Sequence, residues 1–255
     1  METPLNQSTP EAPEPEHWHL AGTVLWGFLI TAIFACLQVV TMLVIVIGRQ
    51  THTPTEDELP ALAAAAQNDG NVLSICTIVT ALFCVPAIVG VIAIKKRSSL
   101  ADYLALSPIA IRPLMQWLGV LGVFVVLSDS LTLALGRPIV PPIMTEAYAS
   151  AHPVWMLWLA LLVFGPLFEE TFFRGFLFKG LAASFVGPIG AVVVTAILWA
   201  GLHVQYDLYG LVTTFFAGVL FGGARLRSGS LIAPLALHSA SNLVATLETI
   251  LVSGG

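Results

Sequence analysis

Long apolar runs without charged side chains dominate the pattern of this 255-residue chain. Four of them contain no Asp, Glu, Lys or Arg: residues 20–47, 72–94, 147–168 and 180–206. A helix needs about 20 residues to cross the hydrocarbon core of a bilayer. Each run therefore predicts a membrane-spanning helix.

Three shorter apolar segments add to these four: residues 114–136, which contain Asp129, then 208–224 and 228–253. The sequence thus predicts an all-α polytopic bundle of seven spans, or eight if one of them is broken. Composition agrees, since only 10% of the residues are charged, against roughly a quarter in soluble domains. We expect an integral membrane protein surrounded by lipid.

The chain divides into three parts by composition. Residues 1–19 form an acidic, proline-rich leader that we expect to be disordered, and the apolar run after it is far longer than the core of a cleaved signal peptide, about 7–15 residues. Residues 20–149 hold three spans and a basic connector, "KKRSSLADYLALSPIAIRP", which is typical of an amphipathic segment on the cytoplasmic surface. Residues 150–255 carry more polar residues within their spans.

Basic residues predict the orientation of the chain. The predicted spans place two basic residues, Arg49 and Arg137, on one side, and seven on the other: Lys95, Lys96, Arg97, Arg112, Lys179, Arg225 and Arg227. Because basic loops stay in the cytoplasm, the N-terminus is predicted to be cytoplasmic. Without a eukaryotic targeting element, a prokaryotic plasma membrane is the expected location. The net charge of −5 gives no indication of a nucleic-acid partner.

Ionisable residues inside spans are costly and mark functional sites or internal pairs. In the segment "EETFFR", Glu170 and Arg174 are four residues apart and are predicted to pair on one helix face. Glu169 lies about 100° around the helix and has no basic residue three or four positions away. Its carboxylate is therefore predicted to be free to act as a general base or acid. Pro166 is expected either to kink this helix or to start a new one.

Two further motifs supply polar groups from other spans. "WAGLH" places Trp199 and His203 four residues apart, and "HSASN" does the same for His238 and Asn242. The side chains of His and Asn can donate hydrogen bonds to a developing oxyanion. Taken as a helix from Pro188, however, the span carries His203 about 22 Å deep, beyond the expected depth of Glu169, so it must start later or tilt.

The same polar residues also have structural interpretations. An intramembrane His serves helix packing about as often as catalysis, and Glu170 with Arg174 alone indicates a structural pair. A proton relay uses similar residue types. The combination of one unpaired Glu, two His and one Asn on three spans favours a functional site over helix packing alone. Glycines at positions 218, 222 and 223 predict close helix packing.

Taken together, "EETFFR", "WAGLH" and "HSASN" resemble the CAAX-protease and bacteriocin-processing (CPBP, or Abi) family of intramembrane proteases, related to the type II CAAX prenyl endopeptidase. The resemblance covers roughly residues 150–250, making 150–255 the expected catalytic domain. One departure is Trp199, where the family usually has Phe, and we interpret this as a matter of packing.

The resemblance implies roles for the polar residues. Glu169 and His203 would activate a water molecule, His238 and Asn242 would stabilise the oxyanion, and Glu170 and Arg174 would support the site. A mechanism without metal is favoured, because Asn suits an oxyanion donor better than a zinc ligand. Zinc held by Glu169, His203 and His238 is the alternative.

The predicted function is therefore an intramembrane endopeptidase that cleaves a membrane-associated protein or peptide near the membrane surface. A scaffold or immunity factor with the same fold, without catalysis, is the first alternative. A proton-coupled transporter is the second. It predicts inverted repeats, and the sequence shows none.

Overall fold

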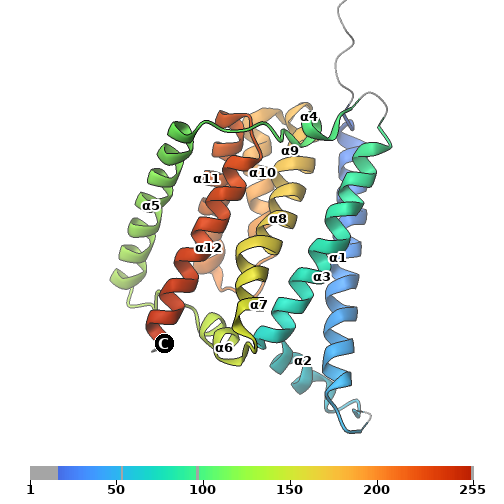
Figure 1. Cartoon of the computed structure of the whole chain (residues 1–255), viewed down its shortest axis with the longest axis vertical. Coiled ribbons are helices and arrows are strands. Elements are labelled where there is room, and N and C mark those ends of the chain that lie inside the picture. The colour runs from blue at the N-terminus through green and yellow to red at the C-terminus, as the bar shows by residue number, and fades with distance from the viewer. Residues whose placement is uncertain (1–16, 53, 96–97, 254–255) are drawn as a thin grey trace, which may run out of the picture.

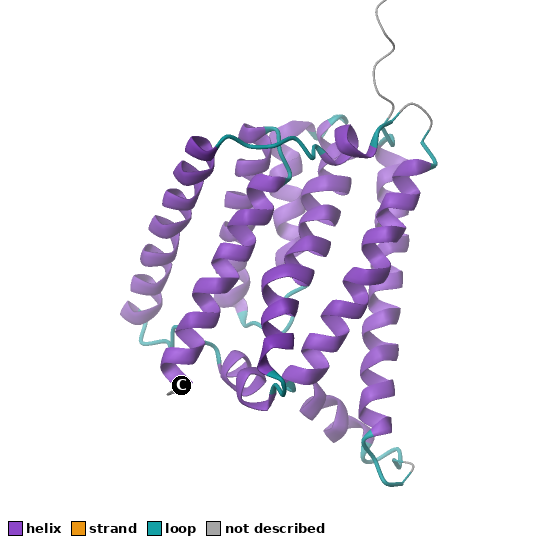
Figure 2. Cartoon of the chain, in the orientation of Figure 1, coloured by secondary structure: helices purple, strands orange, loops and turns teal. Residues whose placement is uncertain are grey.

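The computed structural model describes residues 17–52, 54–95 and 98–253, so most of the predicted leader, together with Lys96 and Arg97, lies outside the described residues. This part of the chain is a bundle of helices joined by short loops, without strands (Figures 1 and 2). The α-helices are α1 (Leu20–Gly48), α2 (Leu59–Gln67), α3 (Gly70–Ala93), α4 (Leu100–Leu104), α5 (Ile111–Ala134), α6 (Pro142–Ser150), α7 (Val154–Leu159), α8 (Gly165–Glu170), α9 (Phe178–Ala182), α10 (Gly187–Gly201), α11 (Leu208–Ser228) and α12 (Ile232–Ser253). Two π-helical turns, η1 (Ala160–Phe164) and η2 (Thr171–Leu177), lie between α7 and α9.

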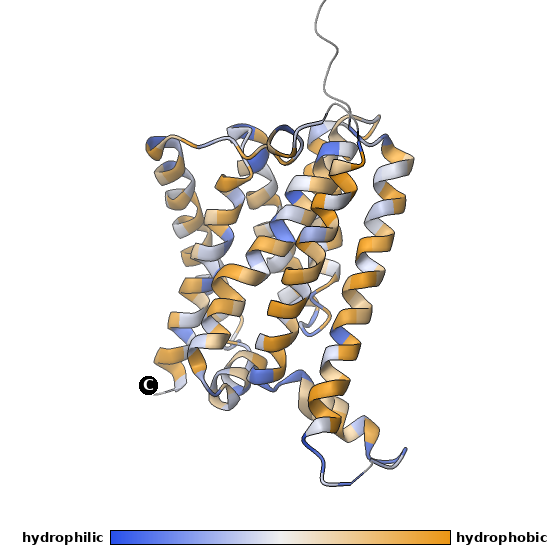
Figure 3. Ribbon diagram, turned by 45° about the vertical axis from the view of Figure 1, so that its right-hand side comes forward, coloured by the Kyte–Doolittle hydropathy of each residue, from blue (hydrophilic) through white to orange (hydrophobic). Residues whose placement is uncertain are grey.

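Six helical stretches of the described chain are long and apolar enough to cross a membrane. They are α1, α3, α5, the continuous run from α7 to α9, α11 and α12. The predicted span at 180–206 is a shorter apolar helix, α10, of 15 residues. The all-α polytopic fold is confirmed, with hydrophobic positions along the helices (Figure 3).

The run from α7 to α9 passes through Pro166 without a break. The π-helical turn η1 comes just before this proline, and Gly165 donates its backbone N–H to Ala160, five residues back. Such a turn absorbs the hydrogen bond that a proline cannot make. Glu169 and Glu170 therefore lie inside a long helix, and no new helix starts at Pro166.

Because the run from α7 to α9 is continuous, the depths of Glu169 and Trp199 in the bundle can be compared. The helix extends to Ala182, thirteen residues beyond Glu169, and Trp199 is twelve residues beyond Gly187 at the start of α10. At 1.5 Å per residue both positions are about 18–20 Å from the connecting loop. The two arms of this hairpin therefore bring Glu169 and Trp199 to the same level, and the expectation that Glu169 lies nearer the surface was wrong.

Burial separates inner from outer helices. The run from α7 to α9 has the largest buried share of the six candidate spans, whereas α1 and α5 expose most of their apolar side chains. In a bilayer such side chains face lipid. The polar residues of α8 and η2 are therefore shielded by surrounding helices.

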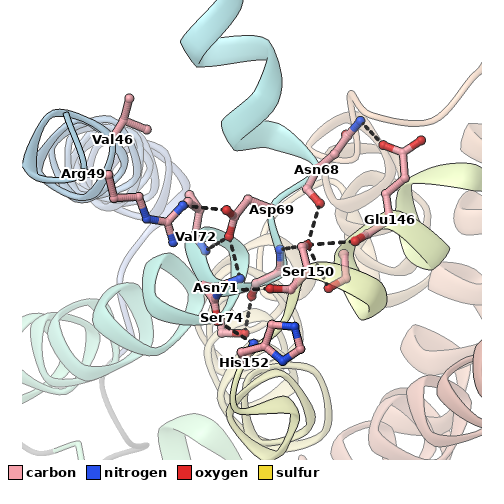
Figure 4. A network of polar contacts seen from close by, with 12 residues as sticks. Val46, Arg49, Asn68, Asp69, Asn71, Val72, Ser74, Glu146, Ser150 and His152 are labelled. Atoms are coloured by element: carbon pink, nitrogen blue, oxygen red, sulfur yellow. Dashed lines mark hydrogen bonds and ion pairs between the residues drawn. The ribbon is translucent and has the colours of Figure 1, made fainter. Parts of the chain in front are cut away.

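The two ends of the bundle are closed differently. At one end, the connector containing α4 is held to the start of α12, because Leu231 donates its backbone N–H to the Ala105 carbonyl at 2.8 Å. At the other end, a polar network joins α1, the start of α3 and α6 (Figure 4). In it Asp69 caps α3 and pairs with Arg49, and Ser150 accepts the N–H of Gly70. Both ends thus fix the helices around the central run.

Candidate active site

Glu170 and Arg174 form the buried core of the polar cluster. Both side chains are 0% exposed, and Arg174 Nη1 donates to Glu170 Oε1 at 2.9 Å. The same carboxylate oxygen lies 2.9 Å from Nδ1 of His238 on α12. The pair predicted from helical spacing is therefore present, and it also holds a histidine that is 68 residues away in the sequence.

Arg174 is stabilised by more than its ion pair. Its Nη2 donates to the Gly218 carbonyl of α11 at 3.1 Å. Its guanidinium lies 4.8 Å from the Trp199 ring centroid and 5.7 Å from that of Phe221. A cation against aromatic faces gains electrostatic attraction, more so when desolvated. These contacts offset the large desolvation cost of a buried charge.

Glu169 faces a different environment from its neighbour. Its side chain is 26% exposed, and its Oε2 accepts a hydrogen bond from the indole N–H of Trp199 on α10. The same oxygen lies 3.9 Å from Nε2 of His238. Glu169 is thus the accessible carboxylate of the pair, placed between α10 and α12.

The hydrogen bond of His238 defines the role of each ring nitrogen. Because a carboxylate only accepts, Nδ1 must carry the proton donated to Glu170, and Nε2 is the atom directed towards Glu169. The ring also stacks against Phe221 with centroids 5.3 Å apart. His238 is therefore fixed in orientation and presents Nε2 to the site.

His203 lies just past the end of α10, in a turn, and not on the helix expected from the "WAGLH" spacing. Its Nδ1 is 2.9 Å from the Trp199 carbonyl oxygen, which only accepts, so Nδ1 is protonated and Nε2 remains an acceptor in the neutral ring. Its ring packs edge-on against Trp199 at 4.9 Å. His203 thus reaches the cluster through Trp199.

Tyr206 is a residue that the sequence reasoning missed. Its ring stacks on His203 with centroids 5.8 Å apart. Burial raises the pKa of the Tyr206 phenol, and the negative charge of Glu169 raises it further. The hydroxyl therefore stays protonated near neutral pH and can serve as a donor. Its position three residues after His203 was the feature of the sequence that could have indicated it as a site residue.

Asn242 lies one helical turn beyond His238 and makes a contact of its own. Its Nδ2 donates to the Leu161 carbonyl in η1 at 2.8 Å. This bond ties α12 to the π-helical turn and uses one of the two hydrogens of the carboxamide nitrogen. The second hydrogen is the one that remains for an oxyanion.

The proposed zinc ligands do not form a metal site in this arrangement. Across residues 17–52, 54–95 and 98–253, no group of three or more His, Cys, Asp or Glu side chains is arranged to hold a metal ion. The Nδ1 atoms of His203 and His238 both donate to oxygen acceptors, which leaves Nε2 of each ring as the atom that could bind a ligand. Zinc therefore stays the alternative that the sequence predicted, and we derive no step through a metal.

The fold and the cluster define an integral membrane protein with ionisable groups enclosed by its helices. Residues 151–244 match the model of the family described as "Type II CAAX prenyl endopeptidase Rce1-like". This part of the chain is thus similar to the CAAX-protease family, which confirms the resemblance carried by the three motifs.

An uncharacterized 24.3 kDa protein of Escherichia coli is 34% identical over 130 residues, which are 49% of this chain. The aligned part spans 59% of that protein's length. No solved structure gives a significant match.

Proposed function

We propose that the chain is an intramembrane endopeptidase that hydrolyses a peptide bond of a membrane-associated protein or peptide at a site within the helix bundle. The observation that carries the proposal is the convergence of Glu169, Glu170 and His238 from two helices that are far apart in the sequence. The match of residues 151–244 to the CAAX-protease family model supports the same reaction class.

Glu169 is proposed as the general base, assisted by His203. Its carboxylate takes a proton from water while the water oxygen forms a bond to the scissile carbonyl carbon. The resulting tetrahedral oxyanion accepts hydrogen bonds from the doubly protonated His238 and from Asn242. The carbon–nitrogen bond then breaks, and the proton passes from Glu169 to the leaving amine.

Glu170 and Arg174 are proposed as structural support. Glu170 balances the charge of Arg174 and orients His238 through Nδ1. An imidazolium at His238 would in turn balance the charge of Glu169, so that the four groups together carry no net charge. This balance lowers the cost of burying them.

The test compares protein termini by mass spectrometry in membranes from cells that carry the wild type or Glu169→Gln at matched expression. Gln keeps the shape of the side chain but cannot accept the proton, so we expect specific fragments to disappear. Glu248→Gln is the matched control, because Glu248 lies on α12 beside Asp129, outside the site. It should leave the fragments unchanged.

Two outcomes would contradict the proposal. Fragments that persist in Glu169→Gln would remove Glu169 from the chemistry. Identical termini together with a retained wild-type phenotype would favour the scaffold or immunity factor over an enzyme.

A further inference from the structure

Trp199 contacts four polar groups of the site, on Glu169, Arg174, His203 and His238. Its ring packs edge-on against His203 at 4.9 Å and against His238 at 5.2 Å. Arg174 lies over its face at 4.8 Å, and only 4% of the residue is exposed. Packing alone accounts for these three contacts, and any large aromatic ring could make them.

The fourth contact needs the indole itself. The indole N–H, which is a donor only, donates to Oε2 of Glu169. This bond fixes the carboxylate through one oxygen, so that the other oxygen, Oε1, can accept a proton from a water molecule. A phenylalanine side chain could fill part of the same space, but it has no N–H with which to hold the carboxylate.

The surroundings also fix the indole. The Gly218 position, where a Cβ would lie 3.0 Å from Trp199 Cε3, packs against one side of its ring. Phe221 lies 5.6 Å from it, centroid to centroid. A donor held by rigid neighbours orients a carboxylate without losing further conformational freedom, which is the arrangement that favours catalysis.

We propose that Trp199 is a positioning residue that orients Glu169 for proton acceptance through its indole N–H. This inference rests on the proposed function, because it gives Trp199 a role only if Glu169 is the base. It predicts that the N–H contributes to the chemical step and that the ring contributes to stability.

The test separates the N–H from the ring. Trp199→Phe removes the N–H and part of the ring, whereas replacement of Trp199 by 3-benzothienylalanine keeps the bicyclic ring and removes only the N–H. Activity is measured on a quenched fluorescent peptide copied from the bond whose cleavage depends on Glu169. Both variants should lower kcat about tenfold or more, as expected for a hydrogen bond to a charged group, with KM within about twofold.

Trp18→Phe is the matched control. The Trp18 indole also donates a hydrogen bond, to the Val91 carbonyl at 3.2 Å, where α1 begins and α3 ends. This variant should keep the wild-type kcat. NMR of the ¹⁵N-labelled indoles adds a direct readout, because the resonance absent in Trp199→Phe should shift in Glu169→Gln.

Three results would overturn the inference. The first is an unchanged kcat in the benzothienylalanine variant, which would assign the role to the ring alone. The second is a Trp199 resonance that does not respond to Glu169→Gln. The third is an equal loss of kcat in Trp18→Phe. Full activity of Glu169→Gln would instead refute the proposed function itself, so the two failures are distinguishable.

Discussion

The adjacent residues Glu169 and Glu170 lie on one helix but in different environments. Successive residues of a helix point about 100° apart, so Glu170 enters the core and Glu169 faces α10 and α12. Glu170 shares one oxygen between Arg174 and His238, whereas Glu169 remains 26% exposed. Identical chemistry at positions 169 and 170 therefore supports two different roles, one structural and one proposed as catalytic.

Arg174→Met should destabilise the protein strongly. It leaves the carboxylate of Glu170 buried without its cation, and breaking a fully buried pair typically costs about 3–5 kcal/mol. We expect a large fall in the unfolding midpoint in detergent, followed by tryptophan fluorescence.

Arg49→Met is the control for this prediction. The Arg49–Asp69 pair is a surface pair, with Arg49 44% exposed, and such pairs contribute about 0–1 kcal/mol. Equal shifts of the midpoint in the two variants would show that burial does not set the strength of the Glu170–Arg174 pair.

At the scale of the helices, glycines decide how closely α10 and α11 approach. A Cβ at Gly218 would lie 3.0 Å from Ala196 Cβ and 3.1 Å from its Cα. A Cβ at Gly222 would lie 2.9 Å from Val192 Cγ1. At Gly223 the nearest atom is 3.9 Å away, on Trp117. Close packing is therefore confirmed for Gly218 and Gly222, and the prediction was wrong for Gly223, which points away from α10.

Gly218→Ala and Gly223→Ala should consequently have opposite effects on stability. The first forces the added methyl group into the backbone of α10 and against Trp199, and overpacking costs typically about 1–3 kcal/mol. The second meets no close atom and should gain up to about 1 kcal/mol from helix propensity. Thermal unfolding of both variants checks this, and a stabilised Gly218→Ala would contradict the packing.

At the scale of the whole molecule, the described chain starts and finishes at opposite ends of the bundle (Figure 1). The end that holds the start of α1 also holds the last turn of α11 with Arg225 and Arg227. Arg49 and Arg137 lie at the other end, in the connections after α1 and α5. This distribution keeps the N-terminus predicted in the cytoplasm.

Fusions to alkaline phosphatase, which is active only outside the cytoplasm, test this orientation. A fusion after residue 252 should be active, whereas one after residue 228, at the end of α11, should be inactive. Green fluorescent protein fused at the same positions should give the complementary pattern. The reverse pattern would place the N-terminus outside and refute the orientation.

The amino-acid sequence alone predicted the membrane spans and the Glu170–Arg174 pair, and it indicated candidate residues for the site. These follow from local properties, namely apolar length and the spacing of side chains along one helix. It could not determine that the helix runs through Pro166 to Ala182, because a π-helical turn is chosen by the packing of the neighbouring helices and leaves no clear pattern in the sequence.

The fold shows which helices meet and which atoms point at one another. It placed His238 on Glu170, moved His203 off its expected helix and showed Asn242 bonded to Leu161. It also showed that Trp199, which was interpreted as a packing residue, donates a hydrogen bond to Glu169. These contacts join residues far apart in the sequence, and their geometry depends on how several helices fit together, which the periodicity of a single helix does not encode.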